Sequence, residues 1–108
     1  MVSEKVAIES GGGLRDYELV VIIRPEIAED KLETTINGIS QFVTERGGTV
    51  SEVQRWGRKK LAYPVKHAME GVYTLTKLKM KPASGRELEA NLEISEDVLR
   101  HLLVKVGD

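Results

Sequence analysis

The segment from Leu19 to Ile23 is apolar at every position, and it constrains the fold of this chain more than any other feature. It ends a run that begins at Tyr17 and is rich in β-branched residues, which favour an extended backbone. A strand with one exposed face alternates apolar and polar residues, whereas a continuous apolar run is typical of a strand covered on both faces. The sequence therefore predicts a central strand from Asp16 to Arg24.

Hydrophobic periodicity predicts an amphipathic helix after this strand. Pro25 breaks the extended pattern, and Gly47 and Gly48 are typical of a left-handed cap at the end of a helix. Between them, apolar residues recur at spacings of four, three and four positions, which place them on one helix face. These residues are Leu32, Ile36, Ile39 and Val43.

The second half of the chain predicts three further strands, because β-branched and alternating residues dominate it. The first of them is interrupted at Trp56-Gly57, where glycine indicates a bulge or bend within one long strand. Residues 67–71 are predicted to form the turn that follows. The three predicted strands span residues 49–66, 72–80 and 98–106.

A second helix is predicted from the segment that begins at Ser84. Ser84 and Glu87 have the spacing of a capping box, in which each side chain accepts a hydrogen bond from a free amide at the helix start. Leu88 and Leu92 provide a short apolar stripe behind it. We therefore expect this helix to start at Ser84.

The predicted order is strand, helix, strand, strand, helix, strand, which indicates an α+β, ferredoxin-like fold. Right-handed crossovers place both helices on one face of a four-stranded antiparallel sheet. The opposite face then contacts solvent, RNA or another protein. We expect residues 1–13, which end in three glycines, to be a flexible leader, and residues 14–108 to form one domain.

Charge is distributed unevenly along the chain. The formal net charge is −1, yet residues 55–86 carry 9 basic and 1 acidic side chains. Residues 1–54 carry 5 basic and 10 acidic side chains, and residues 87–108 carry 2 and 6. Because a local field attracts phosphate even when the total charge is near zero, the middle third is the predicted contact with nucleic acid.

The segment from Arg55 to Lys66 holds five basic residues, two aromatic residues and no acid. Its cations attract phosphates, and the ring of Trp56 provides a surface on which an unpaired base can stack. The same segment also fits a solvated strand edge, on which lysines oppose aggregation. We expect the Tyr63 ring to pack inside the hairpin with its hydroxyl group in solvent.

Catalytic chemistry finds no support in the sequence. The chain has no cysteine, and neither His67 nor His101 has a second metal ligand at a typical spacing. The glycines at 11–13 lack the lysine and the following helix of a nucleotide-binding loop. We therefore expect no enzymatic activity, no cofactor and no metal. The longest apolar run is also too short to cross a membrane.

Several sequence blocks between residues 15 and 106 resemble bacterial ribosomal protein S6 in the order of that family. The most specific block runs from Gly57 to Lys66, and in it basic residues directly precede Leu61-Ala62-Tyr63-Pro64. The others are Asp16-Tyr17-Glu18, Arg24-Pro25, Glu70-Gly71-Val72-Tyr73 and Val98-Leu99-Arg100.

The resemblance implies a ferredoxin-like structural component of the small (30S) ribosomal subunit, located at the cytoplasmic ribosome. It implies that the protein binds the central domain of 16S ribosomal RNA together with ribosomal protein S18, which supports subunit assembly and translation. We expect a monomer when the protein is isolated. The matching hairpin residues Arg58, Lys59 and Lys60 are the expected RNA contacts.

Further site residues follow from the same comparison. Arg15 and Arg100 are secondary candidates for RNA contact, and Trp56 joins them as a ring on which a base can stack. Tyr73 and Leu75 on the third strand are the expected contacts with the protein partner. The chain departs from the family by about a dozen extra residues before the first strand and by a very short tail, so the sheet surface is expected to supply more of the contact with the partner.

Three rival functions share this order of elements. An RNA-recognition motif needs several aromatic rings on its third strand, and here that strand offers only Tyr73. A small enzyme or ligand-sensing domain needs convergent polar groups, which the sequence does not provide. A module that binds only protein stays open, and it would bind its partner without salt-sensitive RNA affinity.

Overall fold

Six elements follow one another in the predicted order. The computed structural model describes residues 13–106, so the predicted leader lies outside the described residues except for its last position. The elements are β1 (Arg15–Ile23), α1 (Glu29–Glu45), β2 (Thr49–Val65), β3 (Ala68–Met80), α2 (Pro82–Glu93) and β4 (Val98–Lys105).

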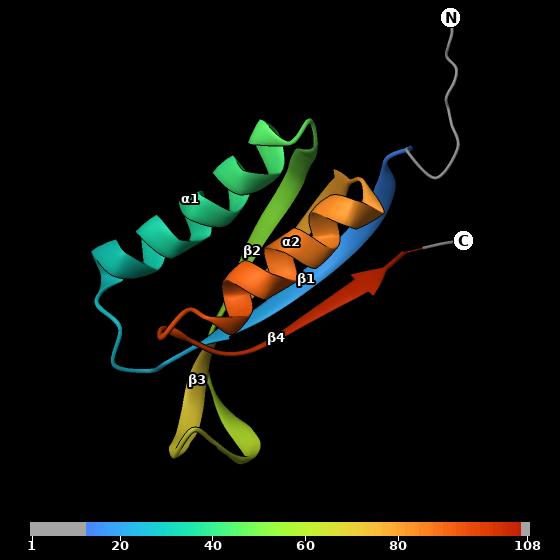
Figure 1. Ribbon diagram of the computed structural model, residues 1–108. Helices are drawn as coiled ribbons and strands as arrows, with labels where there is room; N and C mark the ends of the chain where they lie inside the picture. The colour runs from blue at the N-terminus through green and yellow to red at the C-terminus, as the bar shows by residue number, and fades with distance from the viewer. Residues whose placement is uncertain (1–12, 107–108) are drawn as a thin grey trace, which may run out of the picture.

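The sheet has the strand order β2-β3-β1-β4, and every neighbouring pair is antiparallel. β1 is central, as its apolar run predicts, because Val21 pairs with Thr74 on one side and with His101 on the other. Both helices lie on the same face of the sheet (Figure 1). This arrangement is the predicted ferredoxin-like α+β fold, and it leaves the other face without a helix.

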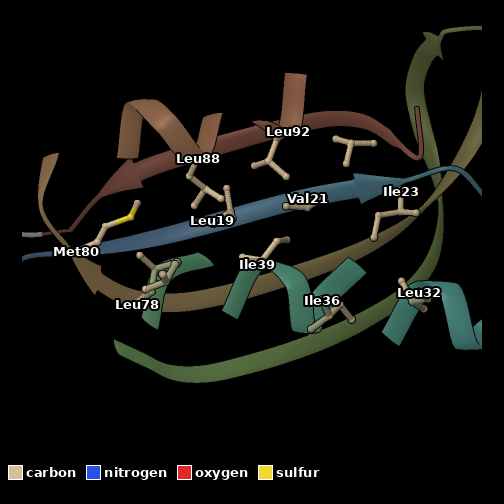
Figure 2. Packing of buried hydrophobic residues seen from close by; sticks show 12 residues of the cluster. Leu19, Val21, Ile23, Leu32, Ile36, Ile39, Leu78, Met80, Leu88 and Leu92 are labelled. Carbon is tan, nitrogen blue, oxygen red and sulfur yellow. The ribbon is translucent and has the colours of Figure 1, made fainter. Parts of the chain in front are cut away.

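The hydrophobic core lies between the helices and the sheet (Figure 2). From β1, the alternate residues Leu19, Val21 and Ile23 point toward the helices and are fully buried. Burial of one such side chain stabilises the fold by about 1.5–3 kcal/mol. The helices, β3 and β4 supply the rest of the core, which includes the whole predicted stripe of α1. These residues are Leu32, Ile36, Ile39, Val43, Leu78, Met80, Leu88, Leu92 and Val98.

The predicted glycine cap ends α1. Gly47 has a φ of +83°, and the amide of Gly48 donates a hydrogen bond to the Val43 carbonyl at 2.9 Å. These are the features of a Schellman motif, which satisfies carbonyls left free at a helix end. Gly48 also lies against β3, since a Cβ atom there would be 2.3 Å from the carbonyl oxygen of Lys79.

Two glycine-to-alanine substitutions should therefore change stability in opposite directions. We expect Gly48→Ala to lower the free energy of unfolding by about 2 kcal/mol, because the new methyl group overlaps backbone atoms. Gly38 lies on the exposed side of α1 with nothing near its Cβ position, so Gly38→Ala should raise that free energy by roughly 0.5–1 kcal/mol. Urea denaturation of both variants checks this. Equal stabilities would contradict the close packing at Gly48.

The predicted start of the second helix is wrong. α2 begins at Pro82, two residues before Ser84, and its N-cap residue Lys81 makes no side-chain capping hydrogen bond. Proline suits the first helical position, because its missing amide hydrogen would have no partner there. Ser84 is buried within the first turn and does not cap it.

The predicted turn between β2 and β3 is too long. Val65 pairs with Ala68, so only Lys66 and His67 connect the strands, and residues 68–71 belong to β3. The predicted interruption at Trp56-Gly57 is confirmed, since the register shifts between Arg55 and Gly57 and Gly57 has a φ of +85°. Glycine adopts that conformation without a steric penalty.

Candidate nucleic-acid interface

The sheet face that carries no helix is apolar in its middle and charged at one end, where Glu18 pairs with Lys77. Strand pairing places Val20 of β1 opposite Leu75 of β3 and Leu102 of β4, and places Ile22 opposite Tyr73. Leu102 keeps 55% of its surface exposed, whereas Leu75 is buried by its neighbours on this face. We call this surface, which consists of Val20, Ile22, Tyr73, Leu75, Arg100, Leu102 and Val104, the open face.

The open face contains two shallow hollows. One has a volume of about 220 Å³ and is bordered by Val20, Tyr73 and Leu102. The other has a volume of about 100 Å³ and lies between the open face and residues 61–65 of the β2–β3 hairpin. Ile22, Tyr73 and Arg100 border both hollows, so the two are adjacent. An apolar surface of this shape fits side chains of a protein partner.

The β2–β3 hairpin extends beyond the rest of the sheet (Figure 1). β1 ends at Ile23, opposite Val72, so the last residues of β2 and the first of β3 have no third strand beside them. The register shifts by three residues between Lys60 and Val65, a stretch that includes Pro64. Such a bulge bends a strand, and proline is tolerated there because it has no amide to pair.

Contacts with β4 hold the end of the hairpin in place. The Lys66 ammonium group donates a hydrogen bond to the Val98 carbonyl at 3.1 Å. The Arg100 guanidinium group donates one to the Tyr63 hydroxyl, and it lies 5.9 Å from the centre of the Tyr63 ring. The Tyr63 side chain is 56% exposed, so the expectation that its ring is packed inside the hairpin is wrong. At this bend the Tyr63 ring lies outside the hairpin, beside Arg100.

The three basic residues predicted to contact RNA do not share one surface. Arg58 is on the helix side of β2, where its guanidinium group donates a hydrogen bond to the Pro25 carbonyl at 2.9 Å and lies 3.7 Å from the Glu70 carboxylate. Lys59 is on the open side, where its ammonium group lies 5.4 Å from the centre of the Trp56 ring. Lys60 is exposed. Arg58 is therefore bonded within the fold although its side chain is 60% exposed, while the two lysines face solvent without such bonds to carboxylates of residues 13–106.

The other predicted residues lie at different distances from the hairpin. Arg100 contacts the hairpin directly through Tyr63. Trp56 is exposed beside Lys59, with its indole donating to Gln54 at 2.9 Å. Arg15 pairs with Met80 at the opposite end of the sheet, so the fold does not bring it to the hairpin.

Other basic residues of the hairpin strands are held by carboxylates. Arg55 donates hydrogen bonds to Glu29 at 2.7 Å and to Glu33 at 2.8 Å, which fasten β2 to α1. The hydrogen bond with Glu29 is the main cause that raises the pKa of Arg55 above its ordinary value. Lys77 lies 3.8 Å from Glu52. These pairs reduce the charge that this part of the chain presents to phosphate.

Lys66 is a basic residue of the hairpin that sequence reasoning counted but did not single out. Its place in a two-residue turn depends on the register of β2 and β3, and the sequence has none of the glycine or asparagine that marks such turns. Within residues 13–106, its ammonium group has no carboxylate within ion-pair distance, and the same holds for Lys59 and Lys60.

Comparison with known proteins decides the family. A family model described as ribosomal protein S6 matches residues 16–105, which is nearly the whole of the described chain. The chain belongs to the ribosomal protein S6 family. It is 43% identical over 95 residues to small ribosomal subunit protein bS6 of Dehalococcoides mccartyi, with 88% of this chain and 87% of that protein covered. It is 39% identical to the bS6 protein of Moorella thermoacetica, covering 88% and 97%.

Solved structures support the same assignment. The 30S ribosomal protein S6 of Thermotoga maritima superposes with a TM-score of 0.80 at 28% identity, covering 86% of this chain and 88% of that one. The C-terminal domain of the MgtC protein from Mycobacterium tuberculosis superposes with a TM-score of 0.58 at 20% identity, covering 91% and 93%, and shares the fold alone. A fold of this kind carries more than one function, so the family match and not the fold is decisive.

Membership in this family makes the chain a structural protein of the small ribosomal subunit, so it functions on the cytoplasmic ribosome and is not an enzyme. The rival assignments to an RNA-recognition motif or a small enzyme are thereby removed. Among residues 13–106, no group of His, Cys, Asp and Glu side chains is arranged to hold a metal ion. No helix of the described part is long and apolar enough to span a membrane.

Proposed function

We propose that this chain binds 16S ribosomal RNA jointly with ribosomal protein S18, in the central domain of the RNA, and supports subunit assembly. The observation that carries the proposal is the juxtaposition of two surfaces with different chemistry. A hairpin with lysines that lack carboxylate partners within residues 13–106 lies beside an apolar open face. Arg100 and Tyr63 connect the two surfaces.

The hairpin supports the RNA part of the proposal. Lys59 and Lys60 are exposed and project from a narrow two-stranded extension, where they can approach a phosphate backbone without a clash from the helices. Trp56 adds an exposed ring next to Lys59, which suits a splayed base or a sugar edge. Arg58, because of its bonds to Pro25 and Glu70, instead holds the base of the hairpin in shape.

The open face supports the partner part. Tyr73 borders both hollows, and Leu75 lies beneath the surface between its neighbours, so Tyr73 is the residue of this pair that a partner would touch. Aromatic residues at the centre of a patch contribute disproportionately to protein binding. In this arrangement S18 binds the open face and RNA binds the hairpin, so each partner occupies only one of the two surfaces.

A mobility-shift titration tests the proposal. A central-domain fragment of 16S ribosomal RNA is titrated with the protein, with S18, and with both proteins together across a salt series. We expect binding that requires both proteins and weakens as salt rises, because phosphate contacts release counterions. A protein that binds S18 but gives no salt-sensitive RNA shift would instead be a module that binds only protein.

Removal of the two exposed lysines should weaken RNA binding. We expect the Lys59→Ala/Lys60→Ala variant, with S18 present, to bind RNA roughly tenfold more weakly and to flatten the salt slope by about 0.7 to 0.9 for each phosphate that it no longer neutralises. The matched control is Lys31→Ala/Lys105→Ala, which removes the same charge from α1 and from the far end of β4. If both variants weaken RNA binding equally, the effect belongs to net charge and not to the hairpin.

A further inference from the structure

The turn between β2 and β3 has an unusual backbone for its residues. Lys66 has a φ of +50° and His67 a φ of +69°, in a two-residue connection that pairs Val65 with Ala68. Positive φ at both central positions defines a type I′ turn, for which Asn-Gly is the favoured sequence. Side chains with a Cβ atom disfavour this region, and strained residues of this kind cluster at functional sites.

The rest of the hairpin does not require lysine and histidine at these positions. The Lys66 hydrogen bond to Val98 is one contact at an exposed side chain, and the Tyr63–Arg100 contact ties the same part of the hairpin to β4 independently. An Asn-Gly turn would keep the two-residue connection and relieve the strain. Lys66 therefore contributes one contact to the fold, but that contact accounts neither for the strained backbone of the turn nor for histidine at position 67.

Chemistry at the turn points to a phosphate group. The Lys66 ammonium group has three donors, and the Val98 carbonyl uses one of them. A hollow of about 310 Å³ beside it is bordered by Lys66, Arg100 and His101, with Glu93 as its one carboxylate. His101 lies 3.7 Å from Glu89 and 3.9 Å from Glu93, so Lys66 and Arg100 supply the positive charge at this hollow.

We propose that the Lys66-His67 turn is a distinct RNA contact, in which Lys66 binds a backbone phosphate at the end of the hairpin. The inference rests on the proposed function and adds a contact that the exposed lysines on β2 do not provide. It explains why a strained turn carries two nitrogen-bearing side chains. It also gives the bend of the hairpin a role, because the bend sets Lys66 beside Arg100 and the 310 Å³ hollow.

A variant with an Asn-Gly turn distinguishes an effect on folding from an effect on RNA binding. We expect the Lys66→Asn/His67→Gly variant to have a thermal midpoint equal to or above that of the parent protein, because the turn strain is relieved. Its affinity for the central-domain RNA fragment, measured by mobility shift with S18 present, should fall about fivefold to tenfold, with a salt slope lower by about 0.7 to 0.9.

A second variant isolates the charge. Lys66→Met keeps the strained turn and the aliphatic stem but removes the ammonium group, and we expect the same decrease in RNA affinity. Lys105→Met is the matched control at the far end of β4 and should leave that affinity unchanged. Parental RNA affinity in both Lys66 variants overturns the inference while leaving the proposed function intact. If the parent protein with S18 does not bind the RNA, both fail together.

Discussion

Replacement of Leu19 by alanine is expected to lower the free energy of unfolding by about 3 kcal/mol. Leu19 has no exposed surface, and it lies in the central strand between Thr76 of β3 and Leu103 of β4. Truncation removes apolar contacts and leaves a cavity that strands on both sides prevent from closing. For a domain of this size, the thermal midpoint should fall by roughly 15 °C, as circular dichroism can measure.

The matched control is the same substitution on the other face of the sheet. Leu102 of β4 is 55% exposed on the open face, so Leu102→Ala removes little buried apolar surface. We expect this variant to stay within about 0.5 kcal/mol of the parent protein. Similar destabilisation by Leu19→Ala and Leu102→Ala would mean that the open face is packed in the isolated protein, contrary to the difference in burial between the two faces.

Local sequence patterns predicted the elements that these substitutions probe. The apolar run from Leu19 to Ile23 predicted a central strand, and the α1 stripe required a surface to pack against. The helices cover Leu19, Val21 and Ile23, whereas the open face on the other side of the run has no helix over it. Hydrophobic periodicity depends only on residues that are close in the sequence, so it predicted these elements without knowledge of how the strands pair. The glycine cap of α1 was likewise predicted from residues that are adjacent in the sequence.

Properties that depend on distant residues could not be predicted. Arg58 looked like a free cation, yet its partners are Pro25 and Glu70, which the sheet register brings to it. The start of α2 was misplaced because a capping box was read at Ser84, a residue that tertiary packing buries. The two-residue turn was missed because Lys66 and His67 lack the usual turn signature. The predicted RNA contacts therefore stay a prediction, and what the fold adds is the different surroundings of their side chains.

The expected contact with S18 gives the largest predicted effect on binding. We expect Leu102→Asp to weaken the affinity for S18 by at least about thirtyfold, measured by isothermal titration calorimetry. Leu102 borders the 220 Å³ hollow with Val20 and Tyr73, so a partner side chain placed there would leave the new carboxylate without water or a counterion. Joint binding to RNA should weaken with it, since the proposed assembly needs both proteins.

The control is an equally drastic change on an exposed apolar residue of the helix layer. Ile94, at the end of α2, is 79% exposed, and Ile94→Asp should leave S18 affinity unchanged. Thermal unfolding of both variants separates a folding defect from a binding defect. If Leu102→Asp folds normally and binds S18 like the parent protein, the open face is not the docking surface. A binding defect confined to Leu102→Asp would assign the open face to the protein partner and leave the hairpin for RNA.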